Sequence, residues 1–130
     1  MADKDLLAAA RAAAARAHAP YSDFRVGAAV WAGGKLYTGC NIENASYGLT
    51  ICAERVAIFA AIADGVRAID ELAVACVDVA PGGDPAGLMP CGACRQVMAE
   101  FAGPELPVQV DGAGTYRLDQ LLPNAFRLPR

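Results

Sequence analysis

Residues 50–58 read Thr50-Ile51-Cys52-Ala53-Glu54-Arg55-Val56-Ala57-Ile58, and residues 90–97 read Pro90-Cys91-Gly92-Ala93-Cys94-Arg95-Gln96-Val97. Each stretch places cysteine where a helix is expected to begin, since helical apolar spacing follows in both. Together they supply three thiols and one carboxylate. A catalytic zinc site with one open coordination position is built from such groups, so the rest of the chain is expected to be arranged around these two stretches.

Both stretches supply ligands to such a site, and the first also supplies its acid–base group. Cys91 and Cys94 form a C-x-x-C pair that can bind one ion from a single turn of chain, and Cys52 can supply a third sulfur. Zinc prefers four tetrahedral ligands, so three protein ligands leave the fourth position to water. Glu54 lies two residues after Cys52 and is suited to take a proton from that water and pass it on. The sequence therefore predicts one Zn²⁺ per chain, bound by Cys52, Cys91 and Cys94, with Glu54 as the catalytic residue.

Length and composition limit the classes of protein to consider. The chain has 130 residues, 55% of them hydrophobic, and a net charge of -3. These values predict a single domain over residues 1–130 with a packed core. Met1–Asp5 lacks the basic start of a signal peptide and no apolar run is long enough to span a membrane, so a cytoplasmic location is expected. The absence of a basic stripe disfavours nucleic acid and favours a small neutral substrate.

The predicted elements alternate between helices and strands, which is typical of a layered α/β domain. Helices are expected over 5–18, 52–63 and 91–101, with one helical turn over 119–122, and strands over 24–32, 35–43, 72–79, 107–110 and 116–118. Gly33-Gly34 predicts a tight hairpin between the first two strands. The irregular segment 80–89 directly precedes Pro90 and is in a position to form one wall of the site. Periodicity alone leaves the order of the strands open.

Five motifs resemble those of the small homotetrameric zinc-dependent cytidine deaminases. They are the two cysteine stretches and residues 20–28, 39–47 and 121–126, and their order and spacing argue against a chance match. The resemblance implies a three-layer α-β-α sandwich with a mixed five-stranded sheet. It also implies a hydrolase that converts cytidine and deoxycytidine to uridine and deoxyuridine, with release of ammonia, in pyrimidine salvage.

The resemblance further implies roles for residues beside the zinc site. Three thiolates on Zn²⁺ carry excess negative charge, and Arg55 would offset it by donating hydrogen bonds to them, helped by the positive ends of the two helices. Asn41 and Glu43 lie two residues apart in an extended segment, so their side chains would point the same way and bind the ribose 3′-hydroxyl together.

The remaining substrate contacts are implied in the same way. Phe24 would pack on the pyrimidine ring, while the backbone at Ala53 and Cys91 would bind the carbonyl and amino groups of the base. Tyr47 and Phe126 match family residues that reach a neighbouring subunit's site. A homotetramer with shared active sites is therefore expected.

The residues leave alternatives open. A blasticidin-type nucleoside deaminase would share the three cysteines and the glutamate, and an RNA- or DNA-editing deaminase is disfavoured by the acidic composition. A structural zinc or thiol-redox module would need a fourth ligand, for which Cys40 and Cys76 are available, or a disulfide cycle. We expect Cys76 to be a small buried hydrophobic residue, Cys40 to have no metal role, and His18 to lie on the surface at a helix end.

Overall fold

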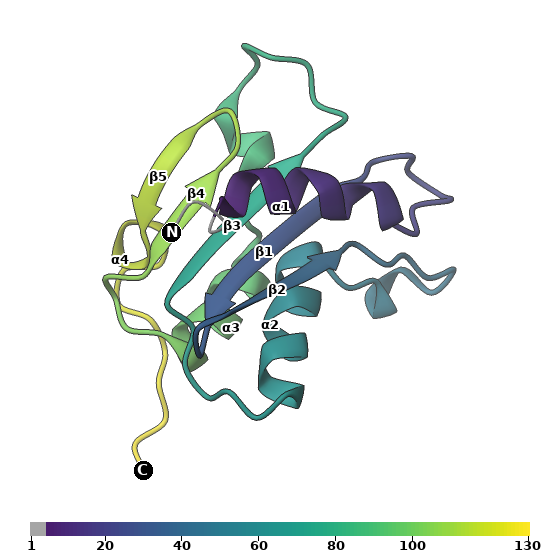
Figure 1. Cartoon of the computed structure of the whole chain (residues 1–130). Helices are drawn as coiled ribbons and strands as arrows, with labels where there is room; N and C mark the ends of the chain where they lie inside the picture. Colours follow the sequence, from purple (N-terminus) through teal and green to yellow (C-terminus); the bar gives the residue numbers. More distant parts are fainter. Residues whose placement is uncertain (1–4) are drawn as a thin grey trace.

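The computed structural model describes residues 5–130 and has a central sheet flanked by helices (Figure 1). The helices are α1 (Leu6–Ala13), α2 (Ala53–Ala63), α3 (Gly92–Phe101) and α4 (Leu118–Leu121). The strands are β1 (Val26–Ala32), β2 (Lys35–Cys40), β3 (Glu71–Cys76), β4 (Pro107–Val110) and β5 (Gly114–Arg117). Three short 3₁₀ segments lie in the connections: η1 (Ala14–Arg16), η2 (Tyr47–Leu49) and η3 (Pro85–Leu88).

The sheet has the strand order β2-β1-β3-β4-β5. β1 pairs antiparallel with both β2 and β3, β3 and β4 are parallel, and β4 and β5 are antiparallel. The predicted mixed five-stranded sheet is therefore confirmed. The predicted hairpin turn is also confirmed, because Gly33 and Gly34 have φ values of 58° and 74°, which glycine adopts without steric cost and which suit a tight two-residue connection.

Helices cover both faces of the sheet and form the three predicted layers (Figure 1). Leu6 and Ala10 of α1 pack on one face against Ala73 of β3. Ile58 of α2 and Met98 of α3 belong to the larger core on the opposite face. The sheet is thus buried on both sides, which accounts for the nearly uninterrupted apolar sequence of its central strands.

Two glycines let the helices lie directly on the sheet. A Cβ atom on Gly27 would lie 1.8 Å from the carbonyl oxygen of Ala10 in α1. A Cβ atom on Gly39 would lie 2.5 Å from the backbone nitrogen of Ala57 and 2.7 Å from the carbonyl oxygen of Ala53, both in α2. No real Cβ atom tolerates such distances, so any larger residue would push a helix off its strand.

Most predicted elements are present but shorter. The helix predicted over 5–18 ends as α-helix at Ala13 and as 3₁₀ helix at Arg16. His18 is exposed, as predicted, but it lies beyond the end of the helix, where it forms a β-bridge with Ile42. The strand predicted over 72–79 ends at Cys76, since the Asp78 side chain instead accepts the backbone N–H of Arg25.

None of the helices within residues 5–130 is long and apolar enough to cross a membrane. The prediction made on Met1–Asp5 rests mainly on residues 1–4, which lie outside the described part of the chain.

Candidate metal centre and active site

The three predicted zinc ligands come from the first turns of two helices. Cys52 is the N-cap residue of α2, Cys91 is the N-cap residue of α3, and Cys94 lies in the first turn of α3. The Sγ atom of Cys91 lies 3.8 Å from that of Cys52 and 3.5 Å from that of Cys94, and all three sulfurs lie within 4.8 Å of one another. Sulfurs bound at roughly 2.3 Å to one tetrahedral zinc ion are about 3.8 Å apart. The thiols are therefore positioned to bind Zn²⁺.

Arg55 lies beside these thiols. Its Nη2 donates to Cys52 Sγ at 3.5 Å, and its Nε is buried without a hydrogen-bond partner in the described chain. The hydrogen bond to Cys52 raises the pKa of Arg55. Hydrogen bonding from Cys94, together with Arg55, lowers the pKa of the Cys52 thiol to about 5. The positive ends of α2 and α3 act in the same direction. The surroundings thus favour the thiolate of Cys52, the form that zinc requires, whereas the same hydrogen bond raises the pKa of the Cys94 thiol.

The carboxyl group of Glu54 is buried next to the thiols. Glu54 is only 4% exposed, and this burial, helped by the negative charge of Cys52, raises its pKa to about 7. A carboxyl group with a pKa near the working pH can both accept and donate a proton. Glu54 also lines the same cavity as Cys52 and Cys91, so its carboxyl group can contact a molecule bound in that cavity.

That cavity has a volume of about 220 Å³. Several predicted site residues share its wall: Phe24, Asn41, Cys52, Ala53, Glu54 and Cys91. Ligand pockets for drug-sized molecules usually measure roughly 300–1,000 Å³. The cavity is therefore large enough for a flat heterocyclic ring, while an attached sugar would extend beyond it.

Asn41 lies on the cavity wall, only 8% exposed. Its Nδ2 donates to the carbonyl oxygen of Phe24 at 2.7 Å, and its Oδ1 accepts from the backbone N–H of Val26 at 2.9 Å. The side chain therefore fixes the backbone on both sides of Arg25. One amide N–H of Asn41 remains for a ligand, because the amide group has two.

Glu43 does not line the cavity, although it was predicted to act together with Asn41. Its Oε1 accepts from the backbone N–H groups of Tyr21 and Ser22 at 3.0 and 3.2 Å, and its Oε2 accepts from the Ser22 hydroxyl. The hydroxyl donor is the main cause that lowers the pKa of Glu43, with the two backbone donors adding to it. Within one chain, Glu43 holds the loop that leads to Phe24.

Tyr47 and Phe126 also lie outside the cavity, with 71% and 68% of their surface exposed. Tyr47 belongs to η2. Phe126 lies in the segment after α4, where its carbonyl oxygen accepts from Gln96 Nε2 at 2.9 Å. Both side chains are thus exposed on the surface of the chain and do not line its own cavity.

Part of the wall was not anticipated. Val26, the first residue of β1, lines the cavity together with Val74 and Cys76 from the second half of β3. Cys76 is half-buried rather than buried, and desolvation raises its pKa to about 11. The prediction that the segment before Pro90 borders the site is confirmed, because residues 87–89 line the cavity.

The described chain adds no fourth sulfur to the thiol cluster. Neither Cys40 nor Cys76 belongs to it. A zinc ion on these thiols would therefore keep one position open, as in catalytic rather than structural sites. Such a ligand set, with a buried carboxyl group at the same cavity and an α-β-α sandwich around it, defines a zinc hydrolase of the deaminase class.

Comparison with known proteins narrows this class. A family model described as "Cytidine and deoxycytidylate deaminase zinc-binding region" matches residues 1–109, and the chain belongs to this family.

Curated relatives and solved structures agree with this assignment. A cytidine deaminase of Sporosarcina psychrophila is 44% identical over 126 residues, which cover 93% of this chain and 88% of the relative. One from Mycobacterium tuberculosis is 49% identical over 117 residues, which cover 89% and 83%. The crystal structure of cytidine deaminase from Burkholderia pseudomallei superposes with a TM-score of 0.82 at 45% identity, covering 93% of this chain and 96% of that one.

Proposed function

We propose that this chain is a cytoplasmic enzyme of pyrimidine salvage that hydrolyses cytidine and deoxycytidine to uridine and deoxyuridine with release of ammonia. The observation that carries the proposal is the buried Glu54 carboxyl group, which shares one cavity with the thiols of Cys52 and Cys91. The names and the identity of the relatives support the same substrate class.

The roles of the residues follow from the chemistry of the reaction. Zn²⁺ held by the three thiolates would act as a Lewis acid that makes water nucleophilic near neutral pH. Glu54 takes one proton from the attacking water and delivers it to N3 of the pyrimidine, which makes C4 electrophilic. Glu54 then passes the second water proton to the amino group, which leaves as ammonia. Its pKa of about 7 suits both directions of transfer.

The substrate is held by groups around the cavity. Phe24 packs on the base, and the backbone at Ala53 and Cys91 binds the edge of the ring; all three positions line the cavity. The free N–H of Asn41, on the cavity wall, and a remaining lone pair of Glu43, outside it, bind the 3′-hydroxyl of the ribose, which extends beyond the cavity. The carboxylate of Glu43 would repel a phosphate at the 3′ position, which disfavours nucleic acid and 3′-phosphorylated nucleotides.

A homotetramer with shared sites completes the proposal. The cavity of about 220 Å³ is small for a whole nucleoside, and the exposed aromatic side chains of Tyr47 and Phe126 contribute nothing to it within one chain. A neighbouring subunit that brings these side chains would enclose the sugar. Mixing inactive Glu54→Gln chains with impaired Phe126→Ala chains tests this, because mixed assemblies contain sites with both native residues and should regain activity. No gain after verified subunit exchange would contradict shared sites.

The first experiment is cytidine turnover by the purified protein, followed by the loss of pyrimidine absorbance, with zinc per chain measured on the same sample. We expect turnover with about one zinc per chain. Bound zinc without turnover of cytidine or deoxycytidine would redirect the search to other amino-substituted substrates, beginning with the blasticidin type. Full activity in zinc-free protein would overturn the mechanism.

A further inference from the structure

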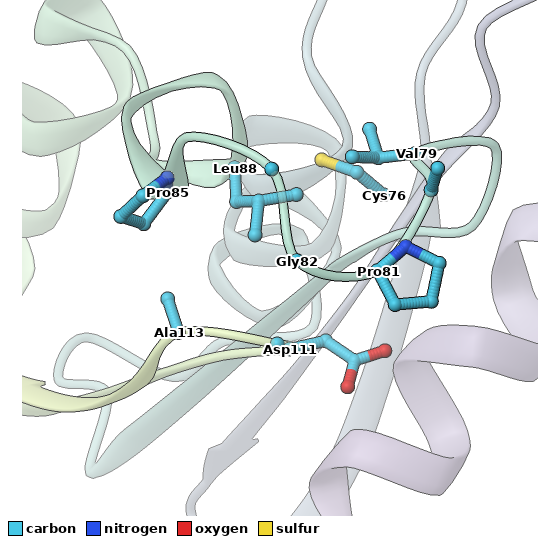
Figure 2. A pocket seen from close by; sticks show the side chains of 11 residues that line it. Cys76, Val79, Pro81, Gly82, Pro85, Leu88, Asp111 and Ala113 are labelled. Carbon is cyan, nitrogen blue, oxygen red and sulfur yellow. The ribbon is translucent and has the colours of Figure 1, made fainter.

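A second cavity of about 360 Å³ lies directly beside the proposed nucleoside cavity. It is lined by residues 79–83 and 85 and by the turn between β4 and β5 at residues 111–113 (Figure 2). Cys76 and Leu88 line both cavities, so these two side chains belong to the wall between them. Asp111 brings no free charge to the second cavity, because it forms an ion pair with Arg11 at 2.6 Å.

Leu88 is the larger part of this shared wall. It ends the η3 segment, whose first turn is capped by the Asp84 side chain. Its Cδ1 atom lies 3.4 Å from the point where a Cβ atom on Gly112 would stand, so the side chain reaches across to the turn between β4 and β5. Figure 2 shows the Leu88 side chain projecting between Pro85 and Cys76. The isobutyl group thus closes the nucleoside cavity toward the larger one.

We propose that Leu88 determines specificity by limiting the size of the base that the enzyme accepts. The proposal rests on the function proposed above. Shortening Leu88 to alanine removes three carbon atoms from the wall and joins a cavity of about 220 Å³ to one of about 360 Å³. Bases that are too large for the first cavity would then place their extra atoms in the second.

The ring position C5 is the place to add such atoms. A substituent at C5 leaves the C4–N4 bond, N3 and the bond to the sugar unchanged, so the reaction itself remains possible. Substituents also alter the intrinsic reactivity of C4. This effect is the same for every variant and cancels when the relative kcat/KM of two variants is compared on the same substrate.

The test measures kcat/KM of wild type and Leu88→Ala for cytidine and for cytidines bearing 5-methyl, 5-iodo and 5-propynyl groups. A missing or added methylene in an apolar pocket changes kcat/KM by about 10- to 200-fold. We therefore expect Leu88→Ala to raise the ratio of 5-propynylcytidine to cytidine turnover by at least about tenfold. Val79→Ala is the matched control, because Val79 lines only the second cavity and its truncation leaves the shared wall intact.

The outcomes separate this proposal from the proposed function. Wild type that fails to deaminate cytidine contradicts the function itself. If wild type and Leu88→Ala are both active and have the same ratio of kcat/KM for 5-propynylcytidine to kcat/KM for cytidine, the proposed role of Leu88 is overturned. It is also overturned if Val79→Ala raises this ratio as much as Leu88→Ala does. If Leu88→Ala does not fold, Leu88→Phe provides the reverse test. The larger side chain should lower the ratio of kcat/KM for 5-methylcytidine to kcat/KM for cytidine, and an unchanged ratio overturns the proposal.

Discussion

Replacing Gly39 with alanine tests whether α2 must lie directly on β2 for the site to work. The new Cβ atom would stand 2.5 Å from the backbone nitrogen of Ala57 and 2.7 Å from the carbonyl oxygen of Ala53. Ordinary contact begins at 3.4 Å, so moving from 2.5 to 3.4 Å displaces the start of α2 by about 0.9 Å. This turn carries Cys52 and Glu54, so the displacement separates them from Cys91 and Cys94 on α3.

The expected magnitudes follow from this displacement. A catalytic group that is misplaced by about 1 Å can cost about 10²-fold in rate, so kcat should fall by roughly that factor. Overpacking a well-packed core typically costs about 1–3 kcal/mol, so the free energy of unfolding should fall by a similar amount. Zinc affinity should also fall, because one of its three thiols moves with α2.

The assay compares kcat per zinc-loaded folded chain, zinc affinity and the urea midpoint of unfolding in Gly39→Ala and Gly27→Ala. Gly27 contacts α1 on the opposite face of the sheet, so alanine there should lower the urea midpoint without lowering kcat. Gly48→Ala should change neither, since a Cβ atom at Gly48 meets nothing within 4 Å. Equal losses of kcat in Gly39→Ala and Gly27→Ala would refute the reasoning, because general loosening would then explain both.

Four further predictions concern the site and its surroundings. Glu54→Gln should retain zinc and lose more than the ~10²–10⁴-fold typical of one acid–base group, since Glu54 serves several proton transfers; wild-type turnover in the zinc-loaded variant would contradict the mechanism. Arg55→Ala should lower zinc retention against a chelator and lower kcat without abolishing either, and identity with wild type would disprove its charge-balancing role. Asp78→Asn should raise KM, because the backbone and guanidinium of Arg25 both donate to Asp78 and so tie the residue after Phe24 to the segment that carries Leu88. Asp111→Asn is the control and should leave KM unchanged, since Asp111 also pairs with an arginine and its side chain is 25% exposed, like that of Asp78. The side-chain hydrogen bond from Arg25 lowers the pKa of Asp78 to about 2, so the stability difference between wild type and Asp78→Asn should persist above about pH 4 and vanish as the pH falls toward 2; a difference independent of pH would contradict this.

The clustering of the three thiols was predictable from the sequence, whereas the full wall of the cavity beside them was not. The C-x-x-C spacing and the Cys-Ala-Glu stretch identify side chains whose function depends on residue type, and the three thiols do cluster as predicted. Glu43 and Cys76 have positions that the sequence pattern does not predict. The bonds of Glu43 to residues 21 and 22 depend on a loop whose path has no periodicity, and Cys76 reaches the cavity only because β3 ends there.

The meeting of Cys52 and Cys91 depends on strand order, which periodicity leaves open. β2 and β3 both pair antiparallel with β1, so they run in the same direction and end at the same edge of the sheet. Each is followed by the helix that begins with one of the cysteines, so both helix starts, with their positive ends, lie at that edge. Had β3 paired parallel with β1, it would have ended at the opposite edge and carried Cys91 away from Cys52. The hairpin at Gly33-Gly34 fixes only the first of these two pairings, so the second, β1 with β3, is the contact on which assembly of the site depends.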